Sequence, residues 1–351
     1  MEMDVVIVGA GPAGANLARL MGNAVRVLVI EAREITHAAP SDPVRKACGG
    51  LLAPDAQRML HRLGLGIPKA VMVDPQVFAV QVTDLHRQLS RSYQRFYFNI
   101  DREKFDRWLV SLIPSSVSIL PKTQYLRYEE TPSGILVHYR QHGLEKRVLT
   151  KVLVGADGAN SLVRAQAFPK RSPRRYIAIQ EWFSTETPPS SFGAIFDPAI
   201  TDFYGWVIPK DNALVVGAAL RPGPEAQQKF NAFKAKLTRG GYRLDHRLRL
   251  EGAFLLRPKP WDVVAGKGAI LLVGEAAGAI SPSSAEGISY ALKTSLFASQ
   301  ALLHDLDHAL PHYHRSLWSV RFNLVLKHLK SPAMYWSWLR LLALKSGFKR
   351  L

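Results

Sequence analysis

The sequence has only one cysteine and no long uninterrupted apolar stretch. With Cys48 alone, the chain can form neither an internal disulfide nor a zinc site built from several cysteines, and it suits a reducing compartment. No run reaches the roughly eighteen apolar residues that predict a membrane-spanning helix. The first residues, Met1-Glu-Met-Asp4, lack the basic segment of a secretion signal. These absences predict a cytoplasmic protein without a transmembrane anchor.

Acidic residues are scarce relative to basic ones. The 351 residues include 28 Asp and Glu against 46 Lys and Arg, which gives a formal charge of +18 at pH 7. This charge favours anionic partners, namely phosphates, nucleic acid or an acidic membrane surface. No RNA- or DNA-binding motif is present, so nucleic acid is not a predicted partner. The eleven histidines do not form an HExxH motif, so no metal site is predicted and they are expected at the surface.

The first thirty residues have the pattern of a dinucleotide-binding unit. The β-branched run 5–8 predicts a buried parallel strand, and Gly9, Gly11 and Gly14 follow it with GxGxxG spacing before an alanine-rich helix. One glycine makes the tight turn, the next lets the backbone approach a pyrophosphate, and the third lets helix pack on strand. A second predicted strand ends at Glu31, whose carboxylate can bind a ribose diol. The stretch alone does not distinguish NAD from FAD.

Antiparallel strand patterns interrupt this parallel unit. Alternating apolar residues predict an antiparallel β-sheet over 76–99 and 176–251, whereas buried strands of parallel type recur at 151–154 and 269–273. The prediction is therefore an α/β fold in which the two kinds of sheet are interleaved. A Rossmann-type dinucleotide-binding domain takes residues 1–75, 100–175 and 252–305, a substrate domain takes 76–99 and 176–251, and a C-terminal helical segment takes 306–351.

The C-terminal segment has its own composition. After Asp307 there is no acidic residue, while eight Lys or Arg alternate with aromatic residues. Trp318, Phe322, Val325 and Leu329 recur at helical spacing, and a proline at position 332 is expected to end that helix. Two interpretations stay open. Residues 308–351 rest on an anionic membrane surface as a basic amphipathic element, or they pack on the body with a solvated basic face.

Several further motifs occur along the chain in the order of a known family. They are Gly9-Ala-Gly11-Pro-Ala13-Gly14 with Glu31, Lys46-Ala-Cys48-Gly49-Gly50, Arg102 with Phe105-Asp106, Gly155-Ala-Asp157-Gly158, Tyr204-Gly-Trp206-Val-Ile208-Pro209-Lys210, and Gly274-Glu275 followed by Pro282 and Glu286-Gly287-Ile288. Together they resemble the geranylgeranyl reductase group of FAD-dependent oxidoreductases, which share the fold of para-hydroxybenzoate hydroxylase. The resemblance covers about residues 3–305. It implies that the dinucleotide is FAD and that the parallel unit is a Rossmann-type FAD-binding domain.

The resemblance implies protein contacts along the whole length of FAD. Arg102 would reach the phosphates, and backbone N–H groups of Gly287 and Ile288 would lie beside the isoalloxazine, where negative charge develops on reduction. Glu275 stands where the family has Asp, so the FAD oxygen that it contacts is left open. Ala285 stands where the family often has Gly, so the loop before Glu286-Gly287 is expected to be tighter or shifted. The residues assigned to FAD are Gly9, Gly11, Ala13, Gly14, Glu31, Cys48, Gly49, Gly50, Arg102, Asp157, Gly274, Glu275, Gly287 and Ile288.

Cys48, Tyr204 and Trp206 are the predicted catalytic residues. Cys48 matches the family's Cys-Gly pair on the loop over the flavin, although a lone cysteine is commonly a small buried hydrophobe. Tyr204, Trp206 and Ile208 share one face of a strand and would wall a hydrophobic channel. Packing within the sheet is the alternative for these side chains.

The implied reaction is the reduction of C=C bonds in an isoprenoid or polyprenyl lipid. A polyprenyl phosphate or pyrophosphate would account for both an apolar channel and the positive charge. Two alternatives stay open, because a fold does not fix its chemistry. They are an FAD-dependent monooxygenase or halogenase acting on a soluble aromatic, and a non-catalytic flavin-bearing lipid-binding protein. The electron donor, NAD(P)H or a reduced carrier, is not identified, and the expected location is the inner face of the cell membrane.

Overall fold

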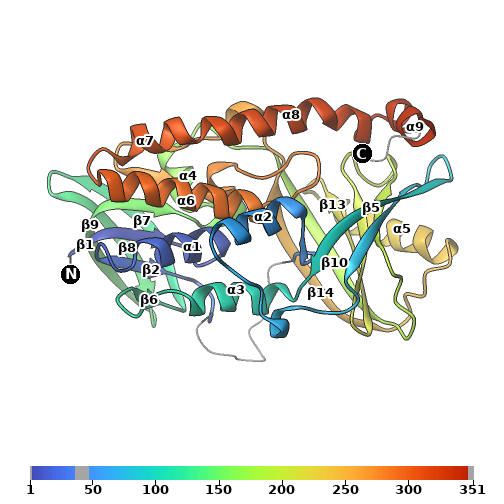
Figure 1. The fold of residues 1–351 in the computed structure, drawn as a ribbon, viewed down its shortest axis with the longest axis horizontal. Helices are drawn as coiled ribbons and strands as arrows, with labels where there is room; N and C mark the ends of the chain where they lie inside the picture. The colour runs from blue at the N-terminus through green and yellow to red at the C-terminus, as the bar shows by residue number, and fades with distance from the viewer. Residues whose placement is uncertain (1, 36–46, 347–351) are drawn as a thin grey trace.

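The protein folds around two mixed β-sheets that lie side by side along the long axis of the molecule (Figure 1). The computed structural model describes residues 2–35 and 47–346. Lys46, which opens the motif containing Cys48, lies outside the described residues, as do residues 347–351 of the tail. The α/β class is confirmed. One sheet carries the glycine-rich turn, and the other carries the strand of the Tyr-x-Trp motif.

The first sheet has a parallel centre with β1 in the middle. β1 pairs in parallel with β2 and with β9, so that Val8 lies beside both Ile30 and Gly155. The carboxyl ends of three strands therefore meet at one edge, the edge at which such sheets bind ligands. The order is β15-β16-β9-β1-β2-β6, and β8 and β7 continue from β9. The strands are β1 (Glu2–Val8), β2 (Val27–Ile30), β6 (Ser118–Leu120), β7 (Thr123–Thr131), β8 (Gly134–Gln141), β9 (Leu144–Gly155), β15 (Gly266–Lys267) and β16 (Ile270–Leu272).

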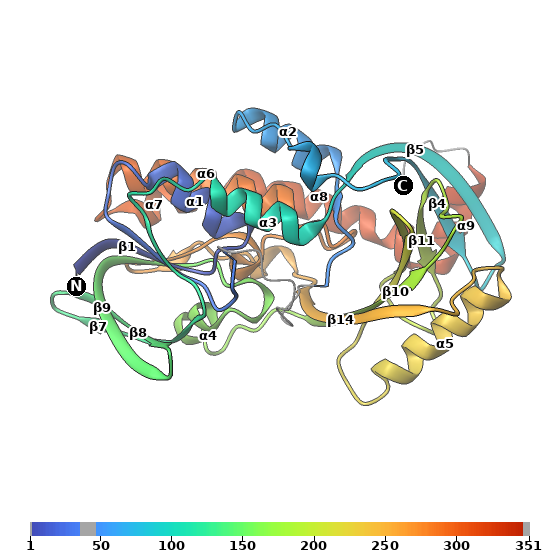
Figure 2. The same ribbon diagram turned by 90° about the horizontal axis from the view of Figure 1, so that it is seen from below.

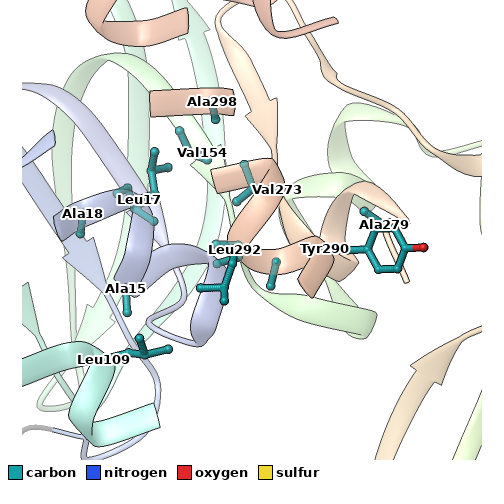
Figure 3. Packing of buried hydrophobic residues seen from close by; sticks show 14 of the residues in the cluster. Ala15, Leu17, Ala18, Leu109, Val154, Val273, Ala279, Tyr290, Leu292 and Ala298 are labelled. Carbon is teal, nitrogen blue, oxygen red and sulfur yellow. The ribbon is translucent and has the colours of Figure 1, made fainter. Parts of the chain in front are cut away.

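Helices cover both faces of the first sheet. α1, α3 and α6 lie on one side and α4 on the other (Figure 2). Small side chains let α1 approach its neighbours closely, as Ala15 beside Leu109 of α3 illustrates (Figure 3). Asp101 accepts hydrogen bonds from two backbone N–H groups of α3 and so caps the start of this helix. The helices are α1 (Pro12–Met21), α2 (Pro54–Arg62), α3 (Arg102–Ser111), α4 (Leu162–Ala167) and α6 (Ile288–His304), with short 3₁₀ turns at Lys69–Val71, Gly158–Asn160, Pro260–Asp262 and Gly274–Ala277.

The second sheet has the order β14-β10-β13-β12-β11-β4-β5-β3. It was predicted to be antiparallel, but β11 pairs with β4 in parallel. The long excursion through the first sheet between these two strands allows them to run in the same direction. α5 (Ala226–Arg239) covers one face through Phe230 and Phe233. The strands are β3 (Leu51–Leu52), β4 (Val77–Asp84), β5 (Leu89–Asn99), β10 (Arg175–Ser184), β11 (Phe192–Phe196), β12 (Gly205–Lys210), β13 (Ala213–Leu220) and β14 (Arg247–Leu256).

The C-terminal helices α7 (Ala309–Ser316), α8 (Trp318–Tyr335) and α9 (Ser337–Lys345) run along one long side of the molecule, from the first sheet to the second (Figure 1). The prediction that Pro332 ends the helix was wrong, because α8 continues to Tyr335. The proline removes a single N–H, and the carbonyl left without it belongs to exposed His328, where water can bind it. None of the helices in the described part of the chain combines the length and hydropathy that a membrane crossing requires.

Three other local predictions need correction. The short strand expected at 151–154 is the end of one long strand, β9, which is shared by the antiparallel and the parallel part of the first sheet. β14 was not predicted as a strand, and its alternation is inverted, with Leu248 and Leu250 exposed and the charged Arg249 and Glu251 partly buried. His138 was expected at the surface, but it is buried at the centre of β8, with a ring nitrogen 3.3 Å from each of Glu129 and Glu145.

Candidate functional site

The glycine-rich turn after β1 forms an open cradle. Gly9 has a φ of +100°, and a Cβ there would lie 2.6 Å from Ala156 O; a Cβ on Gly14 would overlap Gly9 O. Both positions therefore require glycine for protein packing. A Cβ on Gly11 would meet no atom within 4 Å. The space above Gly11 is free to receive a ligand that approaches the backbone.

The start of α1 fits a phosphate group. Gly11 is the N-cap of this helix, it provides no capping side chain, and the first turn has no acidic residue. The unpaired N–H groups and the positive end of the helix dipole are thus left for an anion. Ala13 in the first turn is buried and lies against Gly274, where a Cβ would come within 2.9 Å of Ala13 Cβ. The residues present fit a dinucleotide pyrophosphate at this position.

Glu31 lies directly beside the turn and already has protein partners. Its carboxylate accepts hydrogen bonds from Ala10 N at 2.6 Å and from Arg33 N at 2.9 Å. The Arg33 guanidinium adds two more, at 3.0 and 3.2 Å. A ribose hydroxyl at Glu31 would therefore have to share or displace one of the Arg33 contacts. Arg33 was not among the predicted site residues, although it stands only two positions after Glu31.

A chain of alternating charges connects Glu31 to the predicted flavin end of the site. Arg33 pairs with Asp106 at 3.4 Å, and Asp106 pairs with Arg102 at 2.7 Å. Arg102 in turn donates to Cys48 Sγ at 3.3 Å. The structure thus brings together Glu31, Arg102 and Cys48, three predicted site residues from distant segments. Arg102 lies at the start of α3, and all three nitrogens of its guanidinium donate to Asp106 or Cys48, so a phosphate between the two sheets would have to share or displace one of these contacts.

Arg33, Arg102 and Cys48 line a cleft that is partly open to solvent. One wall comes from the first sheet and α3, and the other comes from the second sheet. Arg33 in this lining binds Glu31 beside the glycine-rich turn, so the cleft lies next to the cradle and reaches the sheet boundary. The lining residues are Arg33, Glu34, Ile35, Cys48, Ile100, Asp101, Arg102, Glu103, Asp106, Arg107, Trp182, Lys210, Arg249 and Glu251.

Lys210 holds the Cys48-Gly49-Gly50 loop in place. Its buried ammonium donates to Gly50 O at 3.0 Å and to Ile100 O at 2.7 Å, which joins the loop to the start of α3. Gly50 has a φ of +59°, and a Cβ on Gly49 would overlap the side chain of Ile208. Burial lowers the pKa of Lys210 to about 7, and the nearby Cys48 opposes this shift. The last residue of the Tyr-x-Trp motif therefore positions the loop that carries Cys48.

Tyr204 and Trp206 do not line the cleft. They lie with Ile208 in a buried cluster of the second sheet, where the Trp206 ring occupies the space above Gly217. Tyr204 Oη donates to Ser284 O at 2.7 Å, and Trp206 Nε1 donates to the Gln180 side chain at 3.3 Å. The alternative of packing within the sheet describes their contacts in this structure. Their catalytic roles stay a prediction.

Asp157 and Glu275 make structural contacts close to the cradle. The Asp157 carboxylate accepts from Ser161 Oγ at 2.5 Å and from Leu162 N at 2.8 Å, and so caps α4; burial raises its pKa. Glu275 accepts from Leu256 N at 2.9 Å, a contact to β14 of the second sheet. The additional methylene relative to Asp lets Glu275 reach that strand. Gly274, with a φ of +59°, donates to Thr294 Oγ1 at 2.8 Å.

The segment before α6 has a left-handed backbone at position 285, although the residue there is alanine and not glycine. Gly287 is the N-cap of α6 and Ile288 is its first residue. The buried Glu286 carboxylate accepts from Ser289 N at 2.8 Å and from Ser289 Oγ at 2.6 Å, and burial raises its pKa. Ala285, which replaces the family's frequent glycine, has a φ of +52°. The loop therefore keeps a left-handed residue at this position, at a conformational cost.

The sequence did not identify the part of the cleft that comes from the second sheet. Gln180 and Trp182 alternate along β10, and Arg249 and Glu251 pair with them from β14. Gln180 donates to Glu251 at 2.6 Å, and the Arg249 guanidinium lies 3.7 Å from the centre of the Trp182 ring. The period-two spacing of these polar and aromatic residues was the available signal. It could not be interpreted without knowing that the two strands are neighbours. Among the described residues, no group of three or more His, Cys, Asp or Glu could hold a metal ion.

Sequence comparisons place the chain among flavoproteins. A family model described as an FAD binding domain matches residues 2–229. Protein CbrA of Escherichia coli O139:H28 is 38% identical over 351 residues, which cover 100% of this chain and 98% of that protein. The match thus extends through all of the elements described above, including the C-terminal helices.

Solved structures share the fold at low sequence identity. A geranylgeranyl bacteriochlorophyll reductase-like protein of Thermoplasma acidophilum has a TM-score of 0.78 at 19% identity, over 97% of this chain and 88% of that chain. CmlS, a flavin-dependent halogenase, has a TM-score of 0.71 at 18% identity, over 93% of this chain and 63% of that chain. Because such distant likeness concerns the fold alone, the two proteins do not select one chemistry for this chain.

Proposed function

Because the chain belongs to the FAD-binding-domain family of flavin oxidoreductases, together with the CbrA proteins, we propose that it reduces carbon–carbon double bonds of an isoprenoid or polyprenyl lipid. FAD is its cofactor, with the pyrophosphate at Gly11 and the start of α1. When bound and reduced by an external electron donor, FAD would supply a hydride to one carbon of the alkene and return to its oxidised form. The proposal concerns the lipid and the type of reaction, which family membership leaves open.

The mixed lining of the cleft beyond Cys48 carries this proposal. Trp182 presents an aromatic ring, and Ile100 and Ile35 add aliphatic surface. Arg249, which pairs with Glu251 at 2.9 Å, and Lys210 lie on the same wall and supply groups that can bind an anion. A long apolar chain with a phosphate or pyrophosphate head group has matching chemistry at both ends.

Positioning is the main contribution that these residues can make. An isolated alkene has no carbonyl group that the protein could polarise, so the reacting carbon has to be held close to the donor in a site that excludes water. The apolar wall would orient the chain, and the guanidinium groups would hold its head group. Two groups on the cleft can hold a proton for the second alkene carbon, namely the Cys48 thiol and the Lys210 ammonium.

An anaerobic reoxidation experiment tests the proposal. FAD-loaded protein is photoreduced and mixed with a polyprenyl phosphate, while the flavin absorbance and the mass of the lipid are followed. We expect flavin reoxidation together with a product heavier by two hydrogens. Oxygen-dependent hydroxylation of an aromatic would instead support a monooxygenase, and a bound lipid of unchanged mass would support a non-catalytic binding protein. NAD(P)H and a reduced carrier protein can be compared as electron donors in the same assay.

The role of the head group can be tested separately with Arg249→Gln. This variant should weaken the use of a polyprenyl phosphate but not of the corresponding alcohol, because only the phosphate pairs with the guanidinium. Arg247→Gln is the matched control, since Arg247 lies two residues earlier on β14, is exposed and does not line the cleft. Equal effects of both substitutions on both lipids would remove the head-group assignment.

A further inference from the structure

α8 has two apolar faces, and only one of them packs on the protein. Leu317, just before the helix, and Val320 and Leu324 within it are buried against the body. On the opposite side, Trp318 is 62% exposed, and Phe322 is 64% exposed. Other exposed apolar residues continue the outer face at intervals of three or four residues, as one side of a helix requires. The outer apolar face comprises Trp318, Phe322, Leu326 and Leu329 of α8, together with Trp336, Trp338 and Leu342 at the start and along α9.

Basic residues accompany this outer apolar face. Lys330 follows Leu326 by four residues and Lys345 follows Leu342 by three, so each lies on the same side of its helix as an exposed apolar residue, and Arg315 lies in the last turn of α7, three residues before Trp318. All three are exposed, and none has an ion pair with any residue that the structure describes. They are therefore free to bind an external anion.

The other cations in the part of the tail that the structure describes bind the protein itself. Lys327 pairs with Asp55 at 3.3 Å, and Arg340 pairs with buried Asp84 at 2.7 Å. Arg321 donates to Val263 O at 3.1 Å. The tail thus divides its positive charges between an inner set that fixes it to the body and an outer set beside the exposed aromatic residues.

We propose that the outer apolar face of α8 and α9 binds the surface of an anionic phospholipid bilayer. Trp, Phe and Leu would enter the interface, and Arg315, Lys330 and Lys345 would lie among the phosphates. The three helices extend along a single side of the molecule, so the whole side can approach a flat surface (Figure 1). This inference does not depend on the proposed reaction.

Charge argues against a second copy of the chain as the occupant. A symmetric dimer through this face would bring two identical tails together, and the tail has no acidic residue after Asp307. Like charges would then face each other across the interface. An anionic bilayer supplies the opposite charge and an apolar interior at once.

Vesicle co-sedimentation of the FAD-loaded full chain tests the proposal. The protein is mixed with vesicles of phosphatidylglycerol and phosphatidylcholine, or of phosphatidylcholine alone. We expect binding to the anionic vesicles that weakens as salt increases. The combined variant Arg315→Gln, Lys330→Gln and Lys345→Gln should reduce the partition coefficient roughly a hundredfold, since each cation near the surface contributes about fivefold.

An apolar variant and a matched control complete the experiment. Trp318→Ser, Phe322→Ser and Leu329→Ser together should abolish binding, whereas Leu248→Ser with Leu250→Ser should not, although both leucines are exposed on β14. Unchanged flavin absorbance and unfolding temperature would show that each variant is folded. The proposal is overturned if the parent protein ignores anionic vesicles, if it binds neutral vesicles equally well, or if the apolar variant changes only self-association measured by sedimentation.

Discussion

Adding one methyl group at Gly11 should separate cofactor binding from protein stability. A Cβ on this residue meets no protein atom within 4 Å, and its φ of −68° with ψ of −175° is ordinary extended backbone. Gly11→Ala should therefore leave the apoprotein as stable as the parent, or more stable by about 0.4–1 kcal/mol, because alanine restricts the unfolded chain. The same methyl group would occupy the space through which a pyrophosphate approaches the start of α1.

The expected loss of FAD affinity follows from the contacts that this approach allows. Losing one hydrogen bond to a charged phosphate costs about 1.5–3 kcal/mol, which raises Kd about 10- to 100-fold. Ligand-induced stabilisation should fall accordingly. FAD at a hundred times the parent Kd stabilises the parent by about 2.7 kcal/mol and should stabilise Gly11→Ala by only about 0.4–1.4 kcal/mol.

The assay combines flavin fluorescence titration, which measures the FAD affinity, with thermal unfolding of apoprotein and FAD-loaded protein. Two further variants serve as controls. Gly66→Ala adds the same methyl group to open space away from the cradle and should change neither quantity appreciably. Gly14→Ala places its Cβ against Gly9 O and should destabilise the apoprotein itself. If Gly11→Ala binds FAD like the parent, the pyrophosphate does not lie at the start of α1. A destabilised Gly11→Ala apoprotein would show that the open space has been wrongly assigned.

Three further substitutions test the packing around the site. Arg340→Met should lower the free energy of unfolding by about 3–5 kcal/mol in urea denaturation, because it leaves the buried Asp84 carboxylate unpaired, and adding Asp84→Asn should restore part of the loss. Ala285→Gly should raise the unfolding free energy by about 1 kcal/mol, since it removes a left-handed alanine at φ +52°; no gain would argue against that backbone. The pKa of Lys210 is about 7 in the folded protein, below its ordinary value of 10.5, so the unfolded chain binds more protons between these values and stability rises with pH across this window. Denaturation at several pH values should show a smaller rise in Lys210→Met, and an unchanged slope would contradict the burial of a titrating Lys210.

The cradle could be predicted from the sequence because it depends on local residues. Gly9, Gly14 and the acid at the end of β2 occur within thirty residues, and their spacing alone requires a tight turn between a strand and a helix. The charge chain through Arg33 and Asp106 was partly visible, since both residues stand close to predicted ones. The sequence could not show that the Arg33 guanidinium already donates to the Glu31 carboxylate. That guanidinium is held in place by Asp106 on α3, a helix from another part of the chain.

The substrate side of the cleft depends on contacts between distant segments. Trp182 and Arg249 meet only because β10 and β14 are neighbours, and no turn signal connects two strands that are more than fifty residues apart. For Tyr204 and Trp206 the strand itself could be predicted, but the surroundings of its face could not. Alternation correctly predicted that they share an environment with Ile208, but a period of two cannot tell whether a strand face meets a cavity or another layer. In the structure that face meets the Cys48 loop and the sheet core.

The tail shows why one helical pattern can permit two different outcomes. Trp318, Phe322 and Leu329 recur at helical spacing, and so do the smaller Leu317, Val320 and Leu324 on the other side. If packing on the body were the only apolar contact, burial of the large aromatic face would give the greater gain, since buried apolar area sets the stabilisation. The structure buries the smaller face and exposes the aromatic one. Because α8 packs on the body through its smaller apolar face, the larger one stays exposed, as the bilayer contact proposed above requires.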